Sequence, residues 1–96
     1  MNKYETMFVL KSELSETERK DLFNQLSDAI TKNQGEVLQA QVWAEKRKLA
    51  YPIKKHTEGM YYLIKFNIPA QKITELNRLY RLNENILRFM FIKQER

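Results

Sequence analysis

The 96-residue sequence predicts an α+β domain, in which two helices cover one face of a four-stranded antiparallel sheet. Apolar residues recur with helical spacing in two segments, one following Ser15 and the other following Pro69. Four further segments are extended in character, so the elements follow the order strand, helix, strand, strand, helix, strand. Two right-handed βαβ units that share one sheet form the split βαβ, or ferredoxin-like, arrangement (βαββαβ).

The first strand is predicted at residues 4–10, YETMFVL, because β-branched and aromatic side chains dominate it. Ser15 and Glu18 then form a capping-box pattern, in which each side chain bonds a free backbone N–H of the other residue. One apolar stripe follows on the helix: Leu22, Phe23, Leu26, Ala29 and Ile30. We expect this helix to end at residues 33–35, with Gly35 in the left-handed conformation.

Residues 36–55, EVLQAQVWAEKRKLAYPIKK, lack helical periodicity, and Pro52 is compatible only with an edge strand. Residues 56–59 have turn chemistry and are expected to join this strand to the next. Residues 60–68 are the strongest strand, and their even-numbered side chains are all apolar or aromatic. This even face is therefore predicted to face the core.

Pro69 is expected to open the second helix. The apolar stripe of that helix comprises Ile73, Leu76, Leu79 and Tyr80. Residues 83–85 break it, and residues 86–93 form the last strand. In the predicted topology the second and fourth strands lie at the two edges of the sheet, and the face without helices is open.

The composition indicates one globular domain spanning residues 1–96. There is no cysteine, which excludes disulfides and thiolate metal sites. The beginning of the chain lacks a secretory-signal pattern, and no segment approaches the ~20 apolar residues needed to cross a bilayer. We therefore expect a soluble cytoplasmic protein without a membrane partner.

Positive charge is concentrated in residues 46–55, which we call the basic segment. Its cations are Lys46, Arg47, Lys48, Lys54 and Lys55, and the other residues carry 12 basic and 12 acidic side chains. The formal net charge of +5 thus equals the charge of this segment. Such a patch suits a polyanion, although a solvated face that favours solubility is an alternative.

The sequence does not favour an enzyme. Its only histidine, His56, lies in a polar stretch, and no phosphate-binding glycine loop, nucleophile motif or metal-spaced ligand set is present. Acyl-phosphate hydrolases of similar fold need an anion-binding loop after the first strand, but the corresponding LKSELSE is acidic and lacks glycine. No cofactor, metal or small-molecule substrate is expected.

A stand-alone RNA-recognition motif is the alternative with the same element order. That family stacks bases on aromatic residues of the third strand, in a pattern that starts with a basic residue and a glycine. Alignment at Gly59 places Glu58 at the basic position and Met60 and Tyr62 at the stacking positions. Both stacking positions belong to the face predicted to be buried, so base stacking on the sheet is disfavoured.

Electrostatic binding of RNA phosphates by the basic segment is the favoured hypothesis. Five phosphate contacts predict a log–log salt slope of about −4 to −5 on a duplex-like target. Leu49, Ala50, Tyr51 and Ile53 are expected to pin the segment to the domain. Candidates for extending the basic surface at neighbouring strand ends are Lys3, Arg88 and Lys93. Alternatively, the charges only protect an edge strand from aggregation.

An apolar edge precedes the basic segment and indicates a protein partner. The residues that form it are Val37, Leu38, Val42 and Trp43. A partner chain would cover such an edge, although packing of Trp43 at the end of the sheet is an alternative. Partner and RNA are therefore expected side by side.

The blocks RKLAYPIKK…EGMYYLIKFNIP and NENILRFMFIK resemble the family of bacterial small-subunit ribosomal protein six. The match includes the basic pair Arg47 and Lys48 before a Leu-Ala-Tyr-x-Ile motif, the opening Tyr4-Glu5, and Arg88-x-Met90. One departure is Glu45, where the family usually has glycine.

This resemblance implies a structural protein of the small ribosomal subunit, located in the ribosome. It implies binding to the central domain of small-subunit ribosomal RNA together with small-subunit ribosomal protein eighteen, with RNA shape setting specificity. A self-associating domain is a further alternative, which sedimentation of the isolated chain would test.

Overall fold

The computed structural model describes residues 1–94, and its elements follow the predicted order. Four strands and two α-helices are present: β1 (Asn2–Leu10), α1 (Glu16–Lys32), β2 (Glu36–Ile53), β3 (His56–Ile68), α2 (Ile73–Leu82) and β4 (Ile86–Lys93). A short 3₁₀ helix, η1 (Ala70–Lys72), follows Pro69 and leads into α2. Pro69 therefore precedes a 3₁₀ turn, whereas the sequence had predicted a direct start of the α-helix.

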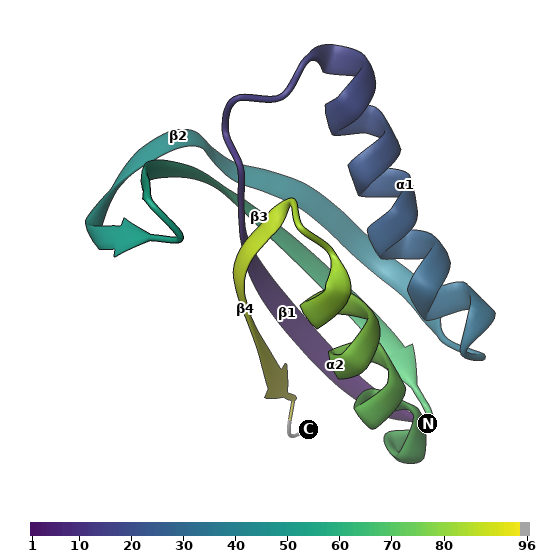
Figure 1. Ribbon diagram of the computed structural model, residues 1–96. Helices are drawn as coiled ribbons and strands as arrows, with labels where there is room; N and C mark the ends of the chain where they lie inside the picture. Colours follow the sequence, from purple (N-terminus) through teal and green to yellow (C-terminus); the bar gives the residue numbers. More distant parts are fainter. Residues whose placement is uncertain (95–96) are drawn as a thin grey trace.

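The four strands form one antiparallel sheet in the order β2-β3-β1-β4. Helices α1 and α2 lie side by side on one face of this sheet (Figure 1). The predicted split βαβ arrangement is confirmed, with β2 and β4 at the edges as expected. The hairpin of β2 and β3 extends past the rest of the sheet and curls at its tip (Figure 1).

The main core lies between the helices and the even-numbered side chains of β1 and β3, as predicted for β3. Phe8 at its centre meets the ring of Tyr80 edge to face, with ring centres 5.0 Å apart. Tyr62 is 6% exposed and stacks on Phe23 of α1, with ring centres 4.1 Å apart. Because Met60 and Tyr62 are both buried here, neither can stack on a base.

Helix α1 begins as predicted and ends differently. The Ser15 hydroxyl accepts a hydrogen bond from the Glu18 N–H, and the Glu18 carboxylate accepts one from the Ser15 N–H. At the other end Gln34, not Gly35, takes the left-handed conformation, with φ 69°. Gly35 is needed for space instead, because a Cβ there would lie 2.7 Å from Ile30 Cγ2 and 2.8 Å from the Asn67 carbonyl.

The predicted turn at residues 56–59 is wrong, because these residues belong to β3. The connection is the two-residue turn Lys54-Lys55, with φ values of 49° and 70°. A two-residue turn with positive φ at both central residues follows the right-handed twist of the strands that it joins. Asn-Gly is the sequence most often found in such a turn. Lys54-Lys55 does not resemble an Asn-Gly pair, which explains why the turn was predicted at residues 56–59 instead.

Strand β2 is longer than the part of β3 that it pairs with. Leu38 and Trp43 are extra residues in β2. The residues that flank Leu38, Val37 and Gln39, pair with two adjacent residues of β3. The residues that flank Trp43, Val42 and Ala44, do the same. A further shift follows Ala44, and after Lys48 the next partners are Ile53 and His56. Bulges bend a strand and increase its twist, so these shifts account for the curl of the hairpin.

Candidate nucleic-acid interface

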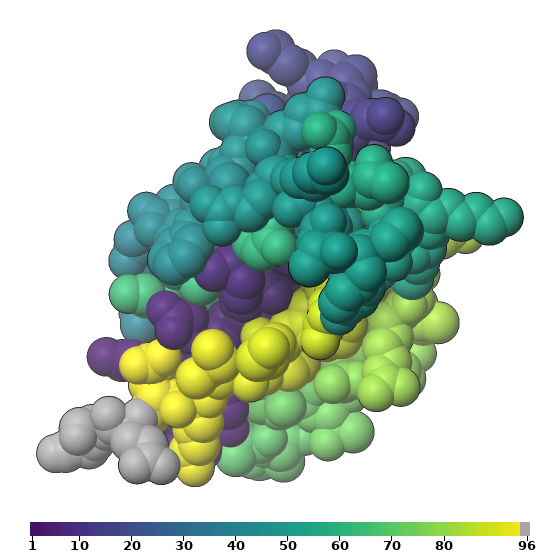
Figure 2. Space-filling view, turned by 90° about the vertical axis from the view of Figure 1, so that its left-hand side faces the viewer, coloured from purple at the N-terminus to yellow at the C-terminus, as the bar shows by residue number. Residues whose placement is uncertain are grey.

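The basic segment forms the end of β2 and the turn to β3, where the hairpin leaves the body of the sheet. It passes over the helix-free face and meets the start of β4 (Figure 2, teal and yellow). Leu49 anchors it there. This side chain is 8% exposed and packs with Val9 and Leu87 in a second apolar cluster, against which Ile53 and Tyr61 also lie.

Gly59 of β3 lies next to this cluster. A Cβ at this position would lie 2.7 Å from Val9 Cγ1 and 3.7 Å from Leu49 Cδ2. Because the Val9 side chain already occupies that space, glycine lets β3 pack closely beneath Val9, against which Leu49 of the basic segment lies. The prediction that the apolar residues pin the segment to the domain is therefore confirmed for Leu49 and Ile53.

Two of the five cations are engaged by neighbouring side chains. Lys46 Nζ lies 3.5 Å from Glu58 Oε1, and both groups are largely exposed, so the ion pair is weak. The Arg47 guanidinium lies over the ring of Tyr61 on the helix-free face, 5.3 Å from the ring centre. The orientation of Arg47, which the sequence left open, is thus toward the protein's own sheet.

The other three cations are available to an anion. Among residues 1–94, no carboxylate lies within 4 Å of Lys48, Lys54 or Lys55. Lys54 nevertheless has a fixed position, since its ammonium donates to the Ile86 carbonyl over 3.3 Å. The segment therefore presents three cations without acidic partners on a backbone that Leu49 holds in place.

Of the three additional predicted cations, Arg88 joins the segment and the two lysines do not. Arg88 Nη1 donates to the Tyr51 hydroxyl over 2.8 Å, so β4 is tied to the segment. Lys3 pairs with Asn67, whereas Arg47 pairs with Gly59, eight residues away on β3. At about 3.3 Å per residue this separates them by about 26 Å.

Lys93 pairs with Tyr4 and so lies beside Lys3, at the other end of the sheet. Paired residues share a face, so Lys93 lies on the face of Tyr4 and Lys3 on the opposite face, and the two lysines do not form one positive surface. The sequence missed Tyr51 as the residue that holds Arg88, because the two are 37 positions apart and only the folded hairpin brings them together.

The apolar edge divides into two outward and two inward side chains. Leu38 is 45% exposed and Trp43 59% exposed, so Trp43 does not pack at the end of the sheet. Val37 and Val42 are half-buried and pack against the main core. The two exposed residues are the bulge residues of β2, and the irregular ladder thus places apolar surface next to the basic segment.

The comparison with known proteins decides the family. The family model described as Ribosomal protein S6 matches residues 3–93. The chain belongs to this family.

Members of the ribosomal protein S6 family resemble the chain over nearly its whole length. The small ribosomal subunit protein bS6 of Caldanaerobacter subterraneus is 42% identical over 95 residues, which cover 99% of both proteins. The protein of the same name from Helicobacter pylori is 46% identical, and the chain spans 66% of its length. The crystal structure of 30S ribosomal protein S6 from Thermotoga maritima superposes with a TM-score of 0.88 at 31% identity, covering 97% of this chain and 87% of the other.

These relatives are ribosomal proteins of the small subunit and not enzymes, which agrees with the predicted ribosomal location and the rejection of catalysis. In the described part of the chain, no helix is long and apolar enough to span a membrane. No group of three or more His, Cys, Asp or Glu side chains in residues 1–94 is arranged to hold a metal ion.

Glu45, the departure from the usual S6 glycine, is accommodated without an unusual backbone. Its φ is not positive, although the ladder still shifts register between Ala44 and Arg47. Its carboxylate accepts a hydrogen bond from the Arg19 guanidinium of α1, with the two atoms 2.7 Å apart. This hydrogen bond lowers the pKa of Glu45 and raises that of Arg19.

Proposed function

We propose that the chain binds the central domain of small-subunit ribosomal RNA through the basic segment, and small-subunit ribosomal protein eighteen through the exposed edge of β2. One observation carries this proposal: on β2 the exposed Trp43 precedes Lys48 by five residues, the turn Lys54-Lys55 follows, and none of these three cations has an acidic partner in residues 1–94. The family relationship supports it, since the relatives are named as proteins of the small ribosomal subunit.

The RNA contacts are proposed to be electrostatic. Lys48, Lys54 and Lys55 are exposed and lack acidic partners in residues 1–94, so they can neutralise phosphates and release counterions. Arg47 and Arg88 lie on the helix-free face and contribute once an anion competes with their present partners, Tyr61 and Tyr51, and Lys46 contributes once an anion competes with Glu58. Lys3 and Lys93, on opposite faces, would act as separate contacts at the other end of the sheet.

The protein contact is proposed to centre on Leu38 and Trp43. Tryptophan is among the residues that most often dominate the binding energy at the centre of an interface, and Leu38 adds apolar area on the same strand. Val37 and Val42 lie beneath them and support the strand from the core side. A partner strand or helix that covers this edge would also extend the surface offered to RNA.

A stand-alone RNA-recognition module is disfavoured by the helix-free face. Tyr61 is the only aromatic side chain that β1 and β3 direct to this face, and Arg47 already lies over its ring. Sequence-specific single-strand binding requires free aromatic platforms. Selective binding of short single-stranded RNA by the isolated chain would favour this alternative.

The test measures affinity for central-domain RNA with and without the partner at several salt concentrations. We expect weak binding by the chain alone and tight binding with the partner, whereas equal affinity would exclude cooperation. Combined Lys48, Lys54 and Lys55→Gln substitutions are expected to reduce the salt slope by about 2 to 3. The control substitutes Lys20, Lys32 and Lys72, which lie on the helical side and change the net charge equally.

Leu38→Ser and Trp43→Ser test the protein contact. We expect both variants to fold normally, because these side chains are exposed, and to lose partner binding and the partner-dependent gain in RNA affinity. Unchanged affinity for the partner would place its binding site elsewhere. Sedimentation of the isolated chain at micromolar concentration separates this proposal from self-association through the same edge.

A further inference from the structure

Two aromatic side chains are exposed in residues 1–94, and both lie on β2. Trp43 is 59% exposed and Tyr51 is 58% exposed. Trp43 precedes Glu45 by two residues and belongs to the apolar edge proposed for the protein partner. Tyr51 lies eight residues further along the strand, inside the basic segment. Neither the apolar edge nor the set of lysines accounts for its exposed ring.

The backbone at Tyr51 leaves the ladder of the sheet and is nevertheless held in place. Residues 49–52 have no partner on β3, because the ladder passes from Lys48 directly to Ile53. Leu49 and Ile53, two residues before and two residues after Tyr51, both pack in the second apolar cluster. The exposed tyrosine therefore lies between two anchored residues.

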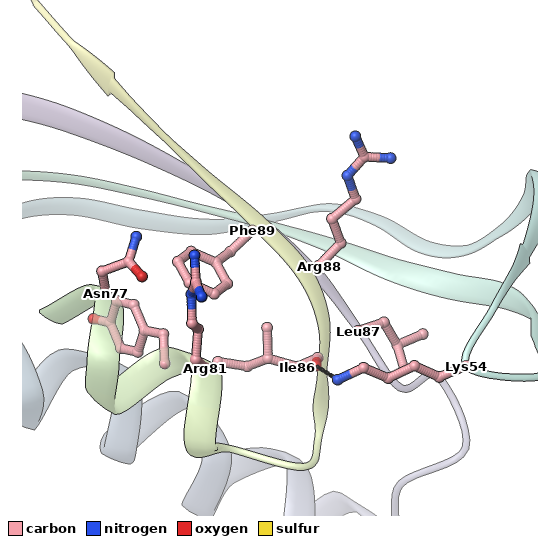
Figure 3. Close-up of a pocket in the computed structure, with 8 residues that line it drawn as sticks. Lys54, Asn77, Arg81, Ile86, Leu87, Arg88 and Phe89 are labelled. Carbon is pink, nitrogen blue, oxygen red and sulfur yellow. Dashed lines mark hydrogen bonds between the residues drawn. The ribbon is translucent and has the colours of Figure 1, made fainter.

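The side chain of Tyr51 is also held at its far end. Its hydroxyl accepts a hydrogen bond from Arg88 Nη1 over 2.8 Å, and Arg88 lies on the helix-free face because it pairs with Val9. Figure 3 shows Arg88 pointing away from Lys54, to the side of the sheet opposite the helices. Pro52 restricts the backbone of Tyr51 to extended conformations. Little conformational entropy is lost when such a preorganised side chain binds a ligand.

The charges around this ring are positive. Lys48 lies three residues before Tyr51 and Lys54 three residues after it, so each Cα atom is at most about 11 Å from that of Tyr51. Neither lysine has a carboxylate within 4 Å in the described part of the chain. Arg88 adds a further positive charge at the hydroxyl. These surroundings suit a ligand that combines negative charge with a flat apolar surface, as a nucleotide does.

We propose that the ring of Tyr51 stacks on an unpaired base of the RNA that the basic segment binds. The inference rests on the proposed function, and it adds a contact that does not depend on charge to contacts that do. Bases in single-stranded loops and bulges stack on aromatic side chains, and every base has a face for this. The contact therefore distinguishes unpaired from paired RNA and not one base from another.

The other tyrosine near the basic segment is unsuited to this role. Tyr61 is half-buried, and the Arg47 guanidinium lies over its ring, 5.3 Å from the ring centre. Among the described residues, no aromatic ring and no guanidinium lies over the ring of Tyr51. A single platform on the hairpin also differs from an RNA-recognition motif, in which bases stack on the central strands of the sheet.

The experiment compares Tyr51→Leu with Tyr51→Phe in binding to central-domain RNA and to inorganic polyphosphate, a polyanion without bases. Affinities of the isolated chain are measured over a range of low salt concentrations. We expect Tyr51→Leu to lower the affinity for RNA by about five- to hundredfold, with an unchanged salt slope and unchanged affinity for polyphosphate. Tyr51→Phe keeps the ring and loses the hydroxyl, so it is expected to bind RNA as the wild type does.

Two outcomes would overturn the stacking contact. One is an unchanged RNA affinity of Tyr51→Leu. The other is an equal loss for Tyr51→Leu and Tyr51→Phe, which would assign the effect to the hydrogen bond with Arg88. The combined Lys48, Lys54 and Lys55→Gln variant separates this failure from that of the proposed function. If it weakens RNA binding while Tyr51→Leu does not, only the stacking contact fails, whereas no effect of either variant removes RNA binding by the basic segment as well.

Trp43→Leu is the matched control, because it removes an equally exposed aromatic side chain from the same strand. We expect it to leave the RNA affinity of the isolated chain unchanged, and a loss equal to that of Tyr51→Leu would overturn the assignment. Weaker binding of the protein partner by Tyr51→Leu, with unchanged RNA affinity, would place Tyr51 in the protein contact instead. An upfield NMR shift of the Tyr51 ring protons with RNA, absent with polyphosphate, supports stacking.

Discussion

The apolar residues on the two faces of the sheet have different roles: one set packs against the helices, and the other holds the basic segment in position. On the helix-covered face, Phe8, Phe66, Tyr62 and Tyr80 form a continuous aromatic core with both helices. On the other face a smaller cluster, formed by Val9, Leu49 and Leu87, is buried and holds the basic segment. The first cluster specifies the fold, whereas the second specifies the position of a set of charges. We therefore expect substitutions in the main core to affect stability without affecting the proposed RNA binding.

The strongest test of this separation is Phe8→Ala in the main core. Phe8 is fully buried, and its removal leaves a large cavity between sheet and helices. We expect the free energy of unfolding to fall by about 3–5 kcal/mol in urea denaturation. The fraction that remains folded is expected to bind RNA as the wild type does. A loss of affinity beyond the unfolded fraction would show that the two faces are coupled.

Leu49→Ala makes the matching change on the other face. We expect a loss of about 2 kcal/mol, at the low end of buried leucine substitutions, because this cluster is small. RNA affinity is expected to fall although no charge is removed, since the basic segment loses its anchor. Leu26→Ala in α1 is the control and is expected to destabilise the protein without lowering the affinity of the folded form.

Replacing Lys54-Lys55 by Asn-Gly changes stability and binding in opposite directions. Asn and Gly adopt positive φ more easily than lysine, so we expect stability to rise by about 0.5–1 kcal/mol. RNA affinity is expected to fall, because two cations are removed. Thermal unfolding and RNA titration of the same variant check both. Reduced stability would show that the Lys54 contact with Ile86 outweighs the backbone cost.

The smallest effect is expected for Glu45→Gln. The folded-state pKa of Glu45 lies below its ordinary value of 4.5, because Arg19 hydrogen-bonds its carboxylate. The contribution to stability is therefore present above about pH 4.5 and is lost as the pH falls through the folded-state pKa. We expect the variant to show a slightly flatter loss of stability in acid. High salt is expected to reduce the difference, since the carboxylate is exposed.

Patterns that depend on local periodicity were predictable from the sequence. The alternation in residues 60–68 identified the buried face of β3, and Ser15 with Glu18 identified the start of α1. The bulges at Leu38 and Trp43 were not predictable, because they arise from the pairing of β2 with β3 and no glycine or proline marks them. Gly35 was interpreted as a conformational signal, whereas it serves the close packing of Ile30 against Asn67.

The candidate site was predictable as a concentration of charge but not as an arrangement. The sequence identified the basic segment and its apolar anchor. It grouped Lys3 and Lys93 with that segment, although the strand register separates Lys3 from Arg47 by about 26 Å. It gave no indication that Lys54 contacts the Ile86 carbonyl, because the start of β4 approaches the β2–β3 turn only in the tertiary structure.

The turn at Lys54 and Lys55 also restricts how these two positions can vary during evolution. Side chains branched at Cβ are excluded by the left-handed backbone, and the residues best suited to it carry no positive charge. Lineages that retain cations here must accept a less favourable turn, whereas lineages that adopt asparagine or glycine must place the charge elsewhere. Covariation between residues 54–55 and the cationic positions around the start of β4 is the expected signature of that choice.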